Sequence, residues 1–401
     1  MFLLDNAIQP YAWGPVDGVA HLVGGAGSGG PEAELWVGAH AGAPSHLSGG
    51  GVSLAEAIAD DPAGLLGPAV VAAFGPRLPF LLKVLAIGSP LSLQAHPSAD
   101  QAAAGFAREE AAGLALDASN RSYRDPWPKP EMLVALVDTW ALCGFRDPST
   151  AAVDLAALGV EGLVPMVEAL AEGGAAGLEA AFGWLLHRRG PAGHRLAGEV
   201  AAAVAGVDTT VLEDRRGWVA RLAETFPGDA GCVAPLLLNL VRLAPGEAVH
   251  LPAGNLHAYL QGAGVELMFA SDNVLRGGLT PKPVDVDELL AVLHFEPGLP
   301  DPVVPRSAGP GRTDYDPGEA SFVLSALVPD AAGGPIEVTS RGPSLLLATG
   351  GPGRVTGRDG EALVVDAGRA VFVAAGEPPV AVTAPAGTTV WWATVGSRPS
   401  G

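Results

Sequence analysis

The chain contains 401 residues and carries a formal net charge of −20 at pH 7. This length is sufficient for two or three domains whose hydrophobic cores need no disulfide bonds. The acidic balance excludes the broad cationic surface that binds nucleic acid or an anionic membrane, whereas a small anionic substrate can still be held by a few local cations.

Cysteine usage and the distribution of apolar residues exclude further classes of protein. The only cysteines, Cys143 and Cys232, each stand alone in an apolar stretch, so we predict neither a disulfide framework nor a cysteine zinc site. Residues 1–14 contain no basic leader segment, and no apolar run reaches the roughly 20 residues that span a bilayer. We therefore expect a cytoplasmic protein that binds neither membranes nor nucleic acid. A monomer is the expected state, although no sequence pattern determines it.

The N-terminal part of the chain is predicted to contain mainly strands and loops. Residues 1–50 combine short apolar runs with glycine-rich turns, a texture that favours strands over helices. Ser53 and Glu56 have the spacing of a capping box, so we expect a short helix that begins there and ends at Pro62. Residues 78–93 follow as an apolar, proline-bounded segment.

The middle of the chain changes to a helical texture and then returns to strands. From about residue 150 to residue 224, long stretches rich in alanine and leucine carry apolar residues at helical spacing, which predicts an all-helical insertion. After Pro235 the pattern becomes strand-like over residues 236–243 and 246–257, with a tight turn at residues 252–254.

A later segment repeats the layout of residues 246–257. Residues 368–379 place glycine, alanine, valine and an Ala-Gly pair at the same relative positions. Repeated units of strand, turn and strand indicate β-barrels of the double-sheet jelly-roll kind, the cupins, although chance similarity is the alternative for so short a match. Pro379 occupies the position of His257, and because proline offers no ligand atom we expect the C-terminal barrel to be metal-free.

These patterns predict a fold that is mainly β with a helical insertion. We expect two jelly-roll (cupin-like) β-barrels plus an all-α domain. The expected domains are a catalytic cupin domain at residues 1–148 with 232–300, a helical insertion domain at residues 149–231, and a degenerate C-terminal cupin domain at residues 301–401.

Lysine is unusually rare in this chain. Only Lys83, Lys129 and Lys282 are lysines among the 23 basic residues. Arginine can replace lysine on a surface, but it cannot lose its proton near neutral pH, whereas a buried lysine amine can act as a base or an acid. The lysines are therefore candidates for chemistry, and the alternative is that they remain at the surface by chance.

Four polar side chains have the chemistry of a metal site. Gln94 and His96 lie two residues apart, so in an extended segment both project to the same face. Glu131 follows a proline, and His257 follows the expected turn. Two imidazoles, a carboxylate and an amide carbonyl suit a divalent ion, zinc in particular, with room left for water. A histidine between alanine and proline is more often a packing residue, so the prediction depends on the whole group.

Several segments resemble type I mannose-6-phosphate isomerases, members of the cupin superfamily. They occur in the order of that family, at residues 33–38, 79–85, 91–97, 129–131, 142–146, 251–259 and 271–282. The specific motifs are Gln-x-His-Pro at residues 94–97 and Ser-Asp-Asn-x-x-Arg-x-Gly-Leu-Thr-x-Lys at residues 271–282. The resemblance extends from Tyr11 to about Leu290 and is weak over the C-terminal barrel.

The resemblance implies an activity and a cofactor. The family interconverts D-mannose 6-phosphate and D-fructose 6-phosphate through a zinc-supported cis-enediol proton transfer, so a phosphorylated hexose is the expected substrate. One zinc ion per chain is expected, with the ligands Gln94, His96, Glu131 and His257.

The proton transfer requires a base and a group that stabilises negative charge on the substrate oxygens. Lys129, beside a proline-fixed ligand position, is the first choice for the base, and Lys83 is the competitor. By the resemblance Arg276 is an active-site cation, and its fixed donors suit a developing oxyanion. Asp272, four residues earlier, is expected to orient Arg276 or to relay a proton.

The phosphate group of the substrate requires local positive charge. We expect Lys83 to bind it together with Ser92, because an ammonium and a hydroxyl can meet a dianion within an acidic protein. Lys282 is a secondary candidate for substrate binding; it precedes a helix expected near Asp285, and the alternative is a surface cation. Glu266 is expected either to support the metal ligands or to face solvent.

One departure from the family concerns Pro128. Family members commonly carry a histidine before the Lys-Pro-Glu triplet, and in some accounts that imidazole assists opening of the sugar ring. Two alternatives stay open: another metal-dependent cupin enzyme, such as a different sugar isomerase or an iron oxygenase, and a non-catalytic sugar-phosphate binding protein. The histidines without a ligand-like context receive no function: His21, His40, His46, His187, His194 and His294.

Overall fold

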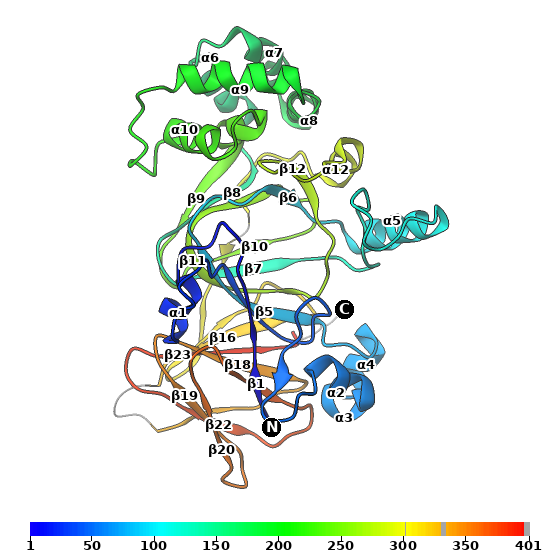
Figure 1. The fold of residues 1–401 in the computed structure, drawn as a ribbon, viewed down its shortest axis with the longest axis vertical. Coiled ribbons are helices and arrows are strands. Elements are labelled where there is room, and N and C mark those ends of the chain that lie inside the picture. Colours follow the sequence, from blue (N-terminus) through cyan, green and yellow to red (C-terminus); the bar gives the residue numbers. More distant parts are fainter. Residues whose placement is uncertain (301, 330–333, 397–401) are drawn as a thin grey trace.

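The computed structural model describes residues 1–300, 302–329 and 334–396, which are mostly β with several helices (Figure 1). The largest described sheet contains β2 (Ala7–Gln9), β3 (Glu34–Val37), β5 (Phe80–Ile87), β6 (Leu93–Ala95), β7 (Glu131–Ala135), β8 (Thr139–Phe145), β9 (Leu238–Leu243), β10 (Ala248–Leu251), β11 (His257–Phe269), β12 (Leu275–Gly278) and β13 (Pro302–Val303). A second sheet contains β1 (Phe2–Asp5), β4 (His46–Leu47), β14 (Arg306–Gly309), β15 (Arg312–Tyr315), β16 (Val323–Leu327), β18 (Ser344–Thr349), β21 (Ala370–Val373) and β23 (Thr389–Thr394). A small third sheet contains β17 (Ile336–Val338), β19 (Gly353–Thr356), β20 (Ala362–Val365) and β22 (Val380–Thr383).

Half of the described α-helices, α6 to α11, lie between β8 and β9. The described α-helices are α1 (Gly18–Val23), α2 (Leu54–Asp60), α3 (Pro62–Leu66), α4 (Pro68–Phe74), α5 (Ala99–Ala111), α6 (Pro148–Ala156), α7 (Val164–Ala171), α8 (Gly174–Leu186), α9 (Pro191–Ala203), α10 (Arg215–Thr225), α11 (Ala234–Leu237) and α12 (Val286–Val292). Residues 148–237 contain helices and turns without a strand, in agreement with the helical texture of this segment. None of the described helices combines the length and the apolar character needed to cross a membrane.

Strand β11 connects the two parts of the largest sheet. Its residues 262–269 pair with β5, and its residues 257–261 pair with β8. Between these parts Gly262 has a φ of 132°, and a Cβ at this position would lie 2.7 Å from the Cα of Thr139. Glycine is therefore required where the strand changes its partners, because only glycine fits both the backbone angle and the close approach.

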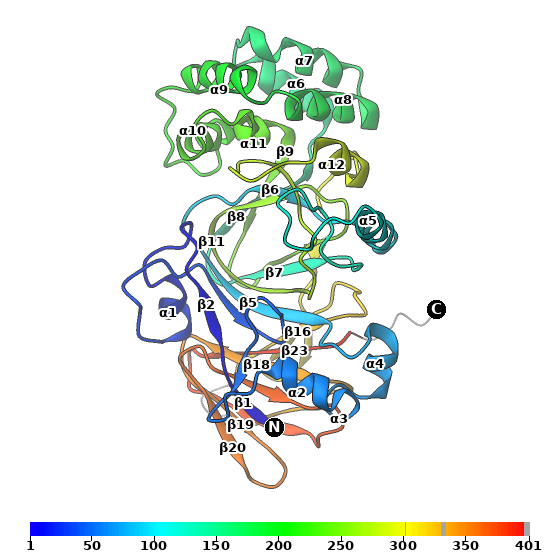
Figure 2. The same cartoon turned by 45° about the vertical axis from the view of Figure 1, so that its right-hand side comes forward.

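The outward faces of the largest sheet are covered by different layers. Val84 and Val265 pack with residues of the second sheet, such as Leu345. Leu142 and Ala258 instead belong to a core that includes helices α6 to α10. Figure 1 shows the resulting order, with these helices at one end, the largest sheet in the middle and the C-terminal strands at the other end. In Figure 2, α5 and α12 lie along the side of the largest sheet.

The segments predicted to be repeats have glycines with similar φ angles before and after their strands. Strands β10 and β21 are preceded by Gly246 and Gly368, whose φ angles are 85° and 84°. Each strand is followed by a turn, with Gly254 at φ 75° and Gly376 at φ 82°. The similarity therefore includes the turns that enter and leave the strand.

Several short elements agree with or differ from the expectations. The Ser53 capping box is present and α2 ends at Asp60, as predicted. Helix α1 was not predicted, because it spans only six residues and has no side-chain cap at its N-terminus. Strand β1 pairs with β21, with Phe2 opposite Phe372, so the first strand extends the sheet of the C-terminal part and not the largest sheet. Such a pairing between distant residues leaves no local pattern in the sequence.

The change Gly262→Ala is expected to destabilise the protein by ~1–3 kcal/mol, the usual range for a strained backbone position. The added methyl group would meet Thr139, whose Oγ1 would lie 2.5 Å away. Thermal unfolding measures the effect. The matched control is Gly198→Ala in α9, where a Cβ meets nothing within 4 Å and alanine is the better helix former. Equal unfolding midpoints for the two variants would contradict this account of the β11 bend.

Candidate metal centre

Three buried side chains from separate strands converge at one point. His96 follows β6, Glu131 begins β7 and His257 begins β11. One ligand atom from each lies within 4.8 Å of the others. The Nε2 atom of His96 is 3.3 Å from Oε1 of Glu131, and the Nε2 atom of His257 is 3.4 Å from Oε2. The arrangement has the size and the donor types of a site for one divalent cation.

Backbone carbonyls fix the orientation of both imidazoles. The Nδ1 atom of His96 lies 2.8 Å from the carbonyl oxygen of Asn273, and the Nδ1 atom of His257 lies 3.0 Å from that of Asn255. In a neutral ring, donation from Nδ1 leaves the lone pair on Nε2. Both Nε2 atoms and Oε2 of Glu131 are buried without a hydrogen-bond partner among the described residues. Unpartnered donor atoms held by such supporting bonds fit a metal ion.

The surroundings of His96 and Glu131 favour the protonation states in which these residues can bind a metal ion. Burial, reinforced by the charge of Lys129, lowers the pKa of His96 to about 4. Burial alone would raise the pKa of Glu131, but Lys129 and the two histidines outweigh it and hold this pKa well below its usual value. His96 is therefore neutral and Glu131 ionised at neutral pH. Lys129 is buried and forms an ion pair with Glu131.

Gln94 and Arg276 lie in the strands beside His257. Gln94 of β6 is opposite His257 of β11 on one side and opposite Arg276 of β12 on the other. Residues opposite each other in a sheet project to the same face, so the amide and the guanidinium share the face of the metal cluster. Cys143 is also opposite His257, but burial raises the pKa of its thiol to about 12, which keeps it protonated.

Lys83 is surrounded by acidic and aromatic groups. Its Nζ lies 3.3 Å from Glu34 and 3.3 Å from Glu266, and it stands 4.9 Å from the centre of the Trp36 ring. Burial alone would lower the pKa of Lys83, but these carboxylates and Glu131 raise it above its ordinary value. Glu266 is buried, so the solvent-facing alternative is wrong, and its described partner is Lys83. Among the described residues, no hydrogen bond joins Lys83 and Ser92.

Lys282, Arg276 and Arg124 are cations linked by electrostatic effects. Lys282 has a pKa lowered first by Arg276, then by partial burial and by Arg124. Burial and Arg124 likewise lower the pKa of Arg276. Within the described ranges no ion pair involves any of these three residues. The helix expected after Lys282 is present as α12, capped by Asp285.

A buried asparagine supports the cluster and was not predicted. The Asn273 side chain accepts a hydrogen bond from the Arg124 backbone amide and donates to the carbonyl oxygens of Asp125 and Trp127. The Asn273 carbonyl in turn holds His96. The sequence motif contains Asn273, but its partners lie about 150 positions away, so spacing along the chain gave no signal.

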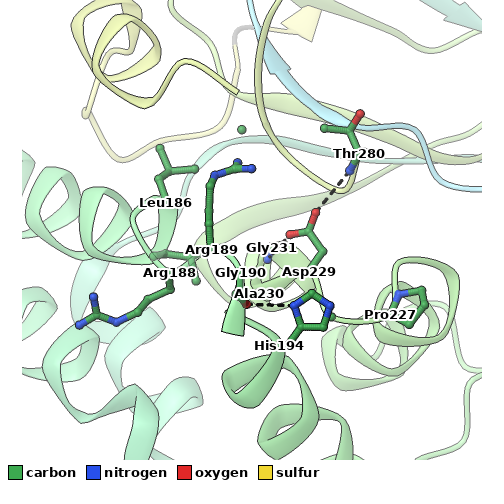
Figure 3. Close-up of a pocket in the computed structure, with 13 residues that line it drawn as sticks. Leu186, Arg188, Arg189, Gly190, His194, Pro227, Asp229, Ala230, Gly231 and Thr280 are labelled. Carbon is green, nitrogen blue, oxygen red and sulfur yellow. Dashed lines mark hydrogen bonds between the residues drawn. The ribbon is translucent and has the colours of Figure 1, made fainter. Parts of the chain in front are cut away.

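A hollow of about 230 Å³ lies where the helices meet β12 (Figure 3). Asp229 bridges this junction, because its carboxylate accepts hydrogen bonds from the amides of Gly231 and Thr280. Arg189 and His194 also line the hollow. None of the predicted site residues does, so it is separate from the metal cluster.

The sequence is similar to a defined family and to proteins named as its members. Residues 1–148 match the family described as phosphomannose isomerase type I, catalytic domain. Mannose-6-phosphate isomerase of Escherichia coli is 36% identical over 389 residues, which cover 94% of this chain and 96% of that protein. The Salmonella typhimurium enzyme of the same name is 37% identical over 393 residues, with 94% and 95% covered.

Solved structures of mannose 6-phosphate isomerase are also similar to this chain. A crystal structure described as mannose 6-phosphate isomerase bound with zinc and yttrium has a TM-score of 0.87 and 34% sequence identity, and covers 98% of this chain and 99% of that chain. A zinc-bound holo structure of the same enzyme has a TM-score of 0.86. Full-length similarity at this level, together with the geometry of the buried cluster, shows that the chain belongs to the type I phosphomannose isomerase family.

Proposed function

We propose that this chain is an enzyme that interconverts mannose 6-phosphate and fructose 6-phosphate. The observation that carries the proposal is the buried group of His96, Glu131 and His257, with unpartnered ligand atoms and a lysine beside it. Relatives named mannose-6-phosphate isomerase match the chain over nearly its whole length. The substrate class is therefore a phosphorylated hexose.

Zinc is the cofactor that this site fits best, and we infer that Gln94, His96, Glu131 and His257 hold one ion. The donor set of two imidazoles, one carboxylate and one amide would leave a bound ion electrophilic, with room for a further ligand. When bound, zinc would supply Lewis-acid polarisation of the substrate oxygens. Asn273 and Asn255 keep the two imidazoles in the orientation that such binding needs.

Lys129 is the better candidate for the base that takes the carbon-bound proton. The base must offer a neutral amine at least transiently. Lys83 is a poor source of one, because its contacts with Glu34 and Glu266 raise its pKa and stabilise the ammonium form. Lys129 has Glu131 as its one described carboxylate partner and lies directly beside the metal cluster. Arg276, on the same face, suits the oxygen on which negative charge develops.

For the phosphate group we infer a site that includes Lys282, Arg276 and Arg124. Arg276 and Arg124 lower the pKa of Lys282, and Arg124 lowers the pKa of Arg276, so these cations act on one another electrostatically and a phosphate dianion would relieve their repulsion. Lys83 with Ser92 remains a prediction. The two carboxylates already paired with Lys83 weigh against this role.

We also infer the domain organisation expected from the sequence: two jelly-roll barrels and an all-α domain between residues 149 and 231. The equivalent turns around β10 and β21 support the paired barrels, and the uninterrupted run of helices supports the insertion. The pairing of β1 with β21 suggests that the first strand belongs with the C-terminal domain. A monomer and a cytoplasmic location stay predictions.

Purified protein is expected to convert mannose 6-phosphate in a coupled assay that detects fructose 6-phosphate. Removal of metal by a chelator should abolish the conversion, and added zinc should restore it, because the ligand cluster is the proposed site of catalysis. Restoration by ferrous ion with consumption of oxygen would instead support an oxygenase. Sugar-phosphate binding without turnover in the zinc-loaded protein would support the binding-protein alternative, which Pro128 motivates.

The variant Lys129→Met is expected to lower kcat by about 10²- to 10⁴-fold, the usual contribution of a positioned base. Zinc content should be retained, since Lys129 is not a proposed ligand. Steady-state kinetics and metal analysis measure both quantities. The comparison variant is Lys282→Met, which removes a cation of the proposed phosphate site and should chiefly raise KM for mannose 6-phosphate. Near-normal turnover by zinc-loaded Lys129→Met would move the base elsewhere.

A further inference from the structure

His40 and Asp272 meet although 232 residues separate them in the sequence. Strands β3 and β11 lie on opposite sides of β5, and each is antiparallel to it. The chain therefore leaves β3 and β11 at the same end of the sheet. His40 and Asp272 each lie three residues beyond the end of their strand, and the Nε2 atom of His40 is 3.2 Å from Oδ1 of Asp272.

The imidazole of His40 is held in one orientation. Its Nδ1 accepts a hydrogen bond of 3.1 Å from the amide of Gly42, so in the neutral ring the proton is on Nε2, where it is donated to Asp272. The ring stands edge-on to Trp36, with centres 4.9 Å apart. Ser45 closes the base of the loop through two hydrogen bonds with Gly38. The side chain of His40 is only 9% exposed, so a donor of fixed direction points at Asp272.

Asp272 has one carboxylate oxygen available. Oδ1 pairs with His40, the backbone amide is bonded to Asp125, and the structure describes no partner for Oδ2. The side chain is 53% exposed, in contrast to its partner. The hydrogen bond from His40 is the main cause that lowers the pKa of Asp272, and Lys129 and Arg124 add to it. The carboxylate is thus ionised and lies within electrostatic range of the proposed base.

We propose that His40 is a positioning residue of the isomerase, which holds the Asp272 carboxylate so that its second oxygen can accept a hydrogen bond from a hydroxyl group of the sugar. The proposal rests on the proposed function. It assigns a role to a histidine that has no ligand-like context in the sequence. His40 acts through Asp272 and does not touch the substrate.

Two amide variants separate the two hydrogen bonds of His40. In His40→Asn the amide stays near the Nδ1 position, so it can still bond Gly42 but is too short to reach Asp272. In His40→Gln the amide extends to the Nε2 position and can donate to Asp272. We expect His40→Asn to lose roughly 10- to 100-fold in kcat/KM, the range for a lost hydrogen bond to a charged group. His40→Gln should recover most of this loss.

A double-mutant cycle tests whether His40 acts through Asp272. Once Asp272→Asn is present, adding His40→Asn should cause little further loss, because the positioned carboxylate is already gone. Additive losses, or equal losses in the Asn and Gln variants, would overturn the proposal, as would full activity of His40→Asn. Zinc content and the thermal midpoint show whether each variant folds. If His40→Asn does not fold, His40→Phe takes its place in the cycle, because it keeps a ring beside Trp36. An inactive zinc-loaded parent protein would refute the proposed function itself, so the two failures are distinguishable.

Discussion

The Glu131 carboxylate is buried among two imidazoles and one ammonium, and the arrangement of the site depends on this interaction. A buried carboxylate is costly unless cationic or hydrogen-bonding groups compensate it. Lys129 provides that compensation through its ion pair, and the two histidines, whose Nε2 atoms lie 3.3 and 3.4 Å from the carboxylate oxygens, come from two other parts of the chain. The strands are fixed accordingly, because Glu131 lies opposite Leu251 in β10 and Met268 in β11. The pairing that places this carboxylate also brings the chemistry of the site together.

An acidic chain binding an anionic substrate requires its cations to be concentrated. The formal charge of −20 opposes the approach of a sugar phosphate at long range. At the site, the positive charges fall into two groups with different surroundings. Lys83 is paired with Glu34 and Glu266, and Lys129 with Glu131, whereas Arg276 and Lys282 have no carboxylate partner in the described chain. Only the second group keeps its charge available for a ligand.

Local residue patterns predicted one part of the site. Contacts between residues far apart in the sequence could not be predicted. The turn before His257 and the buried Lys129 beside Glu131 follow from local patterns. The strand that carries Gln94 ends at Ala95, so His96 lies just beyond it. No local pattern indicates that Asn273 holds His96 or that His40 pairs with Asp272, because β-sheet pairing between remote segments creates these contacts.

The overall architecture shows the same division. Mostly β structure, the helical segment and the repeated turn before and after one strand could be derived from periodicity and glycine placement. The pairing of β1 with β21 could not, since it joins the two ends of the chain. The short helix α1 was also not predicted, because no side chain caps its N-terminus.

The most direct test of the central claim is a crystal structure of the zinc-loaded protein with anomalous data collected at the zinc absorption edge. The account predicts one strong peak per chain, in contact with Nε2 of His96, Nε2 of His257 and the carboxylate of Glu131. It also predicts that the amide oxygen of Gln94 is turned toward the same peak. Full-occupancy zinc elsewhere with no peak between these side chains would contradict it.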